Sequence, residues 1–220
     1  MKKFLLLAGV ACLFAANADA AVRINQYVSG KVSYDWNRNK LKYADEDGIE
    51  RQRLNEKRWG YHVAYGAQAG FVRGEMELNF EDPMKFKYSD EFEQDFSIED
   101  KLKIYKHSLM FNAYFDFLNC SSWTPYVGAG LGPSWLKAKE TVRFDGEKFK
   151  TFDKSTYTLG WQVMAGIAYK INSNWTIDAG YRYADMGRIR KHEVYEQGDW
   201  STTKIAVRDH EATLGIRYTF

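Results

Sequence analysis

The sequence is poor in cysteine and carries almost no net charge. Its 220 residues include two cysteines, Cys12 and Cys120, and 31 Lys and Arg residues stand against 29 Asp and Glu residues, for a formal net charge of +2. So few cysteines exclude a disulfide scaffold. The near balance of charge gives the molecule no strong field, so we expect no nucleic-acid partner.

The sequence is also poor in overall hydrophobicity, with a mean hydropathy of −0.53. This excludes a bundle of membrane-spanning helices, each of which needs about 20 consecutive apolar residues. It does not exclude a membrane barrel, because only alternate residues of a spanning strand face lipid. An apolar share of 45% and an aromatic share of 16% are too high for a disordered chain, so we expect the sequence to fold.

The N-terminal residues 1–20 have the parts of a secretory signal peptide. Two lysines precede an apolar run, and Ala18-Asp19-Ala20 forms a small-x-small cleavage site. We therefore expect cleavage before Ala21 and an exported domain of residues 21–220. An uncleaved anchor helix is a weaker alternative, because the apolar run is shorter than a bilayer requires. A lipoprotein leader acylated at Cys12 is weaker still, because Gly9-Val10-Ala11 lacks the large aliphatic residue expected three positions before such a cysteine.

Beyond the leader, the sequence alternates between apolar and polar residues, which is typical of strands with two unlike faces. In the last segment, Leu214 and Ile216 alternate with Thr213, Gly215 and Arg217. We predict eight strands of about ten residues or more, the length that a tilted strand needs to cross a bilayer. The segments are 23–36, 59–67, 72–80, 108–117, 127–135, 157–169, 175–184 and 210–220.

The connections between these segments are of two kinds. Short turns are expected near Gly70, at 119–122 and at 171–174. Long charged connections occupy roughly residues 37–57, 81–104, 137–155 and 187–203. Short turns at one end and long loops at the other are typical of outer-membrane barrels. We therefore predict an all-β, eight-stranded antiparallel transmembrane up-and-down barrel with short periplasmic turns and four long extracellular loops.

Aromatic residues gather at the ends of the predicted strands. Bands of aromatic side chains mark the two membrane interfaces of outer-membrane barrels. The residues that fit such bands are Trp36, Trp59, Trp123, Trp135, Tyr169 and Trp175.

Three segments carry a family resemblance: PYVGAGLG at 125–132, GWQVMAGIAYKINSNWTIDAGYRY at 160–183 and HEATLGIRYTF at 210–220. They resemble the small eight-stranded outer-membrane barrels, which include the opacity-like surface antigens and the membrane domain of outer membrane protein A. The resemblance implies location in the cell outer membrane. It also implies a C-terminal signal, read by the barrel assembly machinery, of a final Phe preceded by apolar residues at alternate positions. The matching residues are Leu214, Ile216, Tyr218 and Phe220.

The polar faces of the predicted strands bring both signs of charge into one enclosed space. Charges held out of bulk water must be paired, so we predict an ion-pair and hydrogen-bond network that plugs the lumen. Its members are Lys31, Arg73, Glu75, Glu77, Asp116, Asp178, Arg182, Glu211 and Arg217. Eight strands enclose space for side chains or one small ligand. We therefore expect no continuous aqueous pore, and a narrow channel or small-solute carrier is the weaker alternative.

No residue is assigned to catalysis, cofactor binding or metal binding. A lipid-modifying enzyme would need a nucleophile beside a His and a carboxylate. His107 and Ser108 are adjacent and so point to opposite faces of a strand, as do His210 and Glu211. Such an enzyme stays an alternative, because contacts between strands can still assemble the set.

Two short motifs receive structural interpretations. The glycines of 128–132 have no following helix to bind phosphate and are interpreted as small residues on the lumen face. The acidic segment 45–48 lacks the ligand spacing of a calcium loop. It is interpreted as a solvated loop.

The function that we expect is structural and surface-interacting, without enzymatic activity. The four long connections mix both charges with aromatic residues, which give contact area to a partner. Expected partners are outer-membrane lipid and lipopolysaccharide, the barrel assembly machinery, and a host or cell-surface ligand bound through the loops. A soluble periplasmic binding barrel of the lipocalin type, with an apolar interior, is a further alternative.

Overall fold

The computed structural model describes residues 24–44, 49–92, 96–144, 147–194 and 200–220. The expected leader, 1–20, lies outside the described residues. Among those described, no helix is long and apolar enough to cross a membrane. The described chain forms nine strands: β1 (Ile24–Ala44), β2 (Ile49–Ala69), β3 (Val72–Glu81), β4 (Met84–Phe92), β5 (Phe96–Asp116), β6 (Trp123–Phe144), β7 (Glu147–Lys170), β8 (Trp175–Val194) and β9 (Trp200–Thr219).

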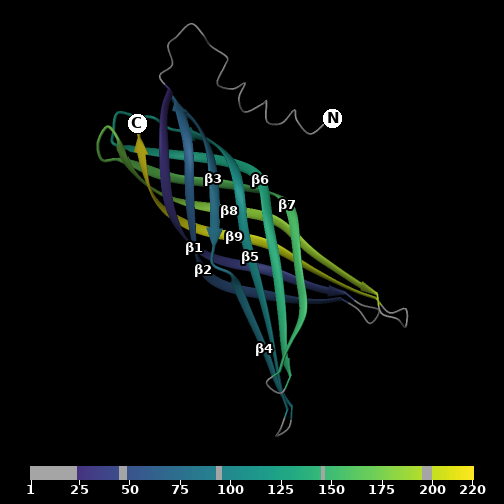
Figure 1. Cartoon of the computed structure of the whole chain (residues 1–220). Coiled ribbons are helices and arrows are strands. Elements are labelled where there is room, and N and C mark those ends of the chain that lie inside the picture. Colours follow the sequence, from purple (N-terminus) through teal and green to yellow (C-terminus); the bar gives the residue numbers. More distant parts are fainter. Residues whose placement is uncertain (1–23, 45–48, 93–95, 145–146, 195–199) are drawn as a thin grey trace, which may run out of the picture.

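The strands close into one antiparallel barrel, as Figure 1 shows. β1 pairs with both β2 and β9, and β3 pairs with β5 to complete the ring. β3 and β4 are two parts of one barrel strand, interrupted at Asp82 and Pro83 and both paired with β5. Proline has no N–H to donate to a ladder, which explains the break at this position. The predicted eight-stranded up-and-down barrel is therefore confirmed.

The alternation of side chains gives the barrel an apolar outer surface and a charged interior. In β3, Glu75 and Glu77 are buried, whereas Met76, Leu78 and Phe80 are exposed. Closure also leaves the strands of the ring without an unpaired edge. The lipocalin-like alternative is wrong, because a barrel in water would carry its polar residues outside.

Tight turns join the strands at one end, as predicted. Gly70 turns from β2 into β3 with φ of 58°, a left-handed conformation that glycine adopts without strain. Between β7 and β8, the Asn172 side chain accepts hydrogen bonds from the backbone N–H groups of Asn174 (2.9 Å) and Trp175 (2.8 Å). The N–H of Phe220 donates to the carbonyl of Gln26 at 3.0 Å. The start of β1 and the C-terminus therefore lie at the same end as these turns.

The four long connections differ from the prediction, because most of their residues continue the strands. The β1–β2 ladder runs on until Ala44 pairs with Ile49, and the β8–β9 ladder runs on until Val194 pairs with Trp200. These hairpins project from the end opposite the C-terminus (Figure 1). Backbone pairing does not require an apolar face, so strands continue where the two-residue alternation of the sequence has faded.

The interior is not charged throughout, because apolar residues also face it. Nine buried apolar residues form a cluster inside the barrel, largely from its hairpin half: Met84, Ile104, Met110, Leu136, Ala138, Ala184, Met186, Ile189 and Val207. In β8 the register against β9 shifts between Asp185 and Arg188, and Gly187 has φ of 92°. This bulge allows Met186 and Ile189 to face inward together, although they are three residues apart.

Candidate functional site

The lumen holds a large set of buried charged side chains, and all nine residues of the predicted network belong to it. Among the described residues, the buried basic side chains are Lys31, Arg58, Arg73, Lys106, Arg182 and Arg217. The buried acidic side chains are Asp35, Glu75, Glu77, Glu81, Asp116, Asp178, Asp209 and Glu211. Charges in such an environment are stable only when paired and hydrogen-bonded.

The central group links three strands across the lumen. The Lys31 ammonium on β1 lies 2.7 Å from Glu75 and 2.8 Å from Glu77, both on β3. The Arg182 guanidinium on β8 reaches Glu77 at 2.8 Å. The Tyr27 hydroxyl adds a hydrogen bond to Glu75 at 3.0 Å. These contacts join opposite walls, so side chains fill the middle of the barrel.

Two further pairs lie nearer the end with short turns. Arg73 donates from Nε to Asp116 at 2.9 Å, and its guanidinium lies 4.2 Å from the ring centre of Tyr114. Arg217 lies 3.6 Å from Asp178. A cavity of about 10 Å³ lies in the lumen and is lined by Lys31, Tyr114, Tyr126, Met164, Tyr181, Arg182 and Thr213.

A fourth group, nearer the long hairpins, was missed in the sequence except for Glu211. Arg58 contacts Asp209 at 3.0 Å and Asp35 at 3.3 Å, and it also pairs with Glu81. Lys106 pairs with both Glu81 and Asp209. Glu81 continues the inward face of β3 two residues beyond Asn79, so an extended alternation would have identified it.

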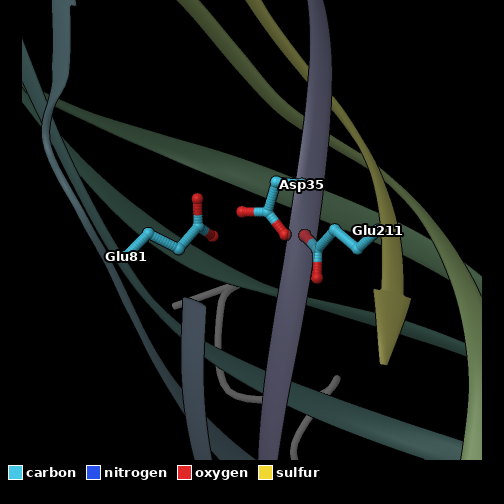
Figure 2. A group of neighbouring side chains, drawn as sticks. All are labelled: Asp35, Glu81 and Glu211. Carbon is cyan, nitrogen blue, oxygen red and sulfur yellow. The ribbon is translucent and has the colours of Figure 1, made fainter. Parts of the chain in front are cut away.

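Three carboxylates of this fourth group point toward one another (Figure 2). Asp35 on β1, Glu81 on β3 and Glu211 on β9 are all buried, and each offers one oxygen within 4.8 Å of the others. The Asp35 carboxylate accepts a hydrogen bond from Ser33 at 2.8 Å. Neither oxygen of Glu211 accepts a hydrogen bond from the described residues.

A Ser–His–Asn chain lies on three neighbouring strands of the lumen wall. His62 Nε2 is 3.0 Å from the Ser33 hydroxyl, and His62 Nδ1 is 2.6 Å from the Asn79 amide oxygen. All three residues have 1% or less of their surface exposed. The Ser33 hydroxyl is buried in the interior and does not reach the outer surface of the barrel. We interpret the chain as a structural hydrogen-bond network.

The other predicted motifs have structural surroundings. His107 packs edge-on against Phe80 on the outer surface, and His210 accepts from or donates to the Tyr181 hydroxyl at 2.6 Å. The His192 side chain lies outside the described residues. The glycines of 128–132 lie in β6, where a side chain at Gly130 would overlap the amide of Asn112. This close approach is the reason for small residues on the lumen face.

The outer surface carries aromatic side chains at both ends of the apolar band. Toward the turns, Trp123 packs on Tyr169 with ring centres 4.6 Å apart, and Trp175 packs on Tyr218 at 4.8 Å. Toward the hairpins, Trp59 packs on a tyrosine of β1. The exposed residues of the predicted bands include Trp36, Trp59, Trp123, Trp135, Tyr169 and Trp175.

The residues of the predicted assembly signal lie on the outer face of β9 and at the C-terminus. Leu214, Ile216 and Phe220 are exposed, and Tyr218 is half-buried between Trp175 and Phe220. A row of apolar groups on one strand face is accessible before the barrel closes. Their role in assembly stays a prediction.

Comparison with curated proteins finds similar bacterial proteins, among them an outer membrane protein, an opacity protein and a protein named as an adhesin. The chain is 31% identical to outer membrane protein PagN of Salmonella typhimurium over 56% of this chain and 53% of PagN. It is 27% identical to opacity protein V28 of Neisseria gonorrhoeae, over 51% of this chain and 52% of that protein. It is 25% identical to a Rickettsia typhi protein provisionally named an adhesin, over 50% and 49%. Each alignment thus spans about half the length of the relative.

A solved structure gives independent support for the fold. The outer membrane protein OprG of Pseudomonas aeruginosa superposes with a TM-score of 0.55 at 13% sequence identity, covering 90% of this chain and 97% of OprG. The predicted fold of an eight-stranded outer-membrane barrel is therefore confirmed.

The sequence match to this architecture extends over almost the entire chain. The outer membrane protein beta-barrel domain family matches residues 7–220. With the closed barrel, the apolar outer band and the opacity-like relatives, this match shows that the chain belongs to the outer membrane protein beta-barrel domain family.

Proposed function

We propose that this protein is a non-enzymatic surface protein, in which a barrel plugged by ion pairs holds extracellular hairpins that contact other cells. The observation that carries the proposal is the division of the molecule into a filled barrel and long projecting hairpins. Arg182 and Lys106 each join opposite sides of the lumen. The β1–β2 and β8–β9 ladders continue well beyond the buried ion pairs of the lumen.

The filled lumen supports a scaffold role over a transport role. The central ion pairs and the apolar cluster of the hairpin half occupy successive levels of the interior. An eight-stranded barrel has little space beyond its inward side chains. A scaffold of this kind holds the hairpins in fixed positions, which lowers the entropy cost of binding through them.

The composition of the hairpins supports a contact role. Their sequences combine aromatic residues with both signs of charge, for example Lys85-Phe86-Lys87-Tyr88 and Tyr195 with Trp200. Such mixtures supply contact area and charge complementarity at protein interfaces. The provisional adhesin name of the Rickettsia typhi relative supports the same class of function.

The test is to produce the barrel in a non-adherent bacterium and to measure the adhesion of that bacterium to host cells. Variants have shortened hairpins whose remaining strand residues keep their native pairing. In β1–β2, Arg38 pairs with Asn55, so residues 39–54 can be replaced by an Asn-Gly turn. In β8–β9, Arg190 pairs with Lys204, so residues 191–203 can be replaced in the same way. We expect the native barrel to confer adhesion and at least one shortened variant to lose most of it.

Folding of every variant is checked by the temperature-dependent gel migration of the barrel. This separates the loss of a contact surface from the loss of the fold. If the native barrel confers no adhesion to any host cell or neighbouring bacterium, or if all shortened variants adhere as well as the native chain, the proposed role is wrong.

A further inference from the structure

The buried charges of the lumen do not balance, and the imbalance lies in one layer. In the part of the chain that the structure describes, six buried basic side chains face eight buried acidic ones. The Arg73–Asp116 and Arg217–Asp178 pairs are neutral. The central group is also neutral, because Lys31 and Arg182 balance Glu75 and Glu77.

The two surplus negative charges therefore belong to the fourth group. Among the described residues, the buried basic side chains of this group are Arg58 and Lys106, and its buried carboxylates are Asp35, Glu81, Asp209 and Glu211, the last of which also lies 3.4 Å from Arg182 of the central group. His62 contacts Asn79 and Ser33, and Arg182 lies 3.4 Å from its Nδ1. That guanidinium opposes a positive charge on the imidazole. An uncompensated charge is costly at this depth.

Glu211 gives a second and independent indication of a missing ligand. Its side chain is fully buried, and neither carboxylate oxygen accepts a hydrogen bond from the described residues. The nearest charged nitrogen is Arg182 Nη1 at 3.4 Å, and Arg182 already contacts Glu77 at 2.8 Å. Buried carboxylates nearly always have hydrogen-bond partners or a metal ion. The Glu211 carboxylate instead points toward Asp35 (Figure 2).

The three carboxylates are close enough together to bind one divalent cation such as calcium. Oxygens of Asp35, Glu81 and Glu211 lie within 4.8 Å of one another. Calcium binds oxygen at roughly 2.3–2.6 Å, so oxygens up to about 5 Å apart can share one such ion. Three carboxylates form a hard oxygen set that favours such ions over zinc or copper.

We propose that Asp35, Glu81 and Glu211 bind one calcium-type divalent cation inside the barrel. The ion joins β1, β3 and β9, and its two positive charges balance the two surplus negative charges. Arg58 and Lys106 remain paired with Asp209, and they also contact the proposed ligands Asp35 and Glu81. The ion thus ties together strands from the beginning, middle and end of the chain.

Entry of the ion is expected during folding. The apolar cluster lies on the hairpin side of the site, and the central group with Lys31 lies on the other side. Exchange of the ion with solvent through the folded barrel is therefore slow. The cation therefore has to be present while the chain folds. An ion that binds only the folded barrel also stabilises it.

The test begins with the full barrel refolded in detergent with calcium, with magnesium or with a chelator. After extensive dialysis, the calcium content and the unfolding temperature of each sample are measured. We expect one calcium ion per native chain and a higher unfolding temperature in calcium than in chelator. Mutation around a metal site typically weakens binding 10–100-fold, so Glu211→Gln, which removes a direct ligand, is expected to weaken it at least about tenfold. It should also abolish the calcium-dependent stabilisation.

Asp82→Asn is the matched control, because Asp82 adjoins Glu81 but is exposed on the opposite face. It should retain one calcium ion. The proposal is overturned if the folded native barrel holds no calcium and calcium leaves its unfolding temperature unchanged, which would mean that protons neutralise the surplus carboxylates. It is also overturned if folded Glu211→Gln binds calcium like the native chain. If Glu211→Gln does not fold, the proposal is decided by the native barrel alone, from its calcium content and its unfolding temperatures in calcium and in chelator.

Discussion

Arg182 of β8 and Glu77 of β3 meet across the lumen, with Nη2 and Oε1 2.8 Å apart and both side chains almost fully buried. The two strands are not neighbours in the barrel order, so this ion pair bridges the interior. It shows how charged residues fill a membrane barrel whose outer face must be apolar.

Removal of one partner of this pair should be strongly destabilising. Arg182→Met deletes the charge that faces Glu77 and Glu211, and loss of one member of a buried ion pair costs about 3–5 kcal/mol. The measurement is urea-induced unfolding in detergent, followed by the gel shift. Lys137→Met is the control, because its pair with Asp153 is partly exposed and should contribute less than about 1 kcal/mol. Equal effects for the two variants would contradict a lumen held by ion pairs.

The filled interior also predicts electrical silence. The native barrel should show no steady single-channel conductance in planar bilayers, because ion pairs and the apolar cluster block successive levels of the lumen. Arg217→Ala should also show no conductance, since it removes only the Arg217–Asp178 pair and leaves the other ion pairs and the apolar cluster in place. Discrete conductance steps that change in Arg217→Ala would instead favour the narrow-channel alternative.

The C-terminal residues make a prediction about assembly. Phe220→Ala should lower the fraction of chains that reach the folded form in the outer membrane, because the expected signal includes the final aromatic residue. The refolding of the purified variant in detergent should change little, because the Phe220 side chain is exposed. Thr219→Ala is the neighbouring control. Normal assembly of Phe220→Ala in cells would contradict the assigned signal.

The Ser–His–Asn chain gives a test of the enzymatic alternative. Ser33→Ala removes hydrogen-bond partners of both Asp35 and His62 and should destabilise the barrel by about 1–3 kcal/mol. It should leave the lipid composition of the host membrane unchanged, because Ser33 is fully buried. A lipid hydrolysis product that forms with the native barrel and disappears with Ser33→Ala would show that the chain is catalytic.

The sequence predicts the barrel well where the two faces of a strand meet different surroundings. In β9, Leu214 and Ile216 face outward while Glu211 and Arg217 face inward, and this contrast appears as a two-residue period. The same contrast identifies all nine predicted lumen residues as inward-facing. Which of them pair could not be predicted, because partners such as Arg182 and Glu77 lie far apart in sequence.

The prediction fails where that contrast ends or its phase changes. Glu81 and Met84 both face inward, but Asp82 and Pro83 stand between them and break the alternation. In the sequence, this part of the strand therefore resembles the start of a loop. The bulge at Gly187 shifts the alternation of β8, which hides Ile189 from a two-residue pattern. In the hairpins the ladders continue without an apolar face to reveal them.

The most direct test of the account is gel migration of the protein from carbonate-washed outer membranes, with and without boiling in dodecyl sulfate. A closed barrel filled with side chains should remain in the washed membrane, migrate as a compact species when unboiled and shift on boiling. Release by carbonate, together with identical migration of the two samples, would contradict the closed, membrane-embedded barrel on which every other proposal depends.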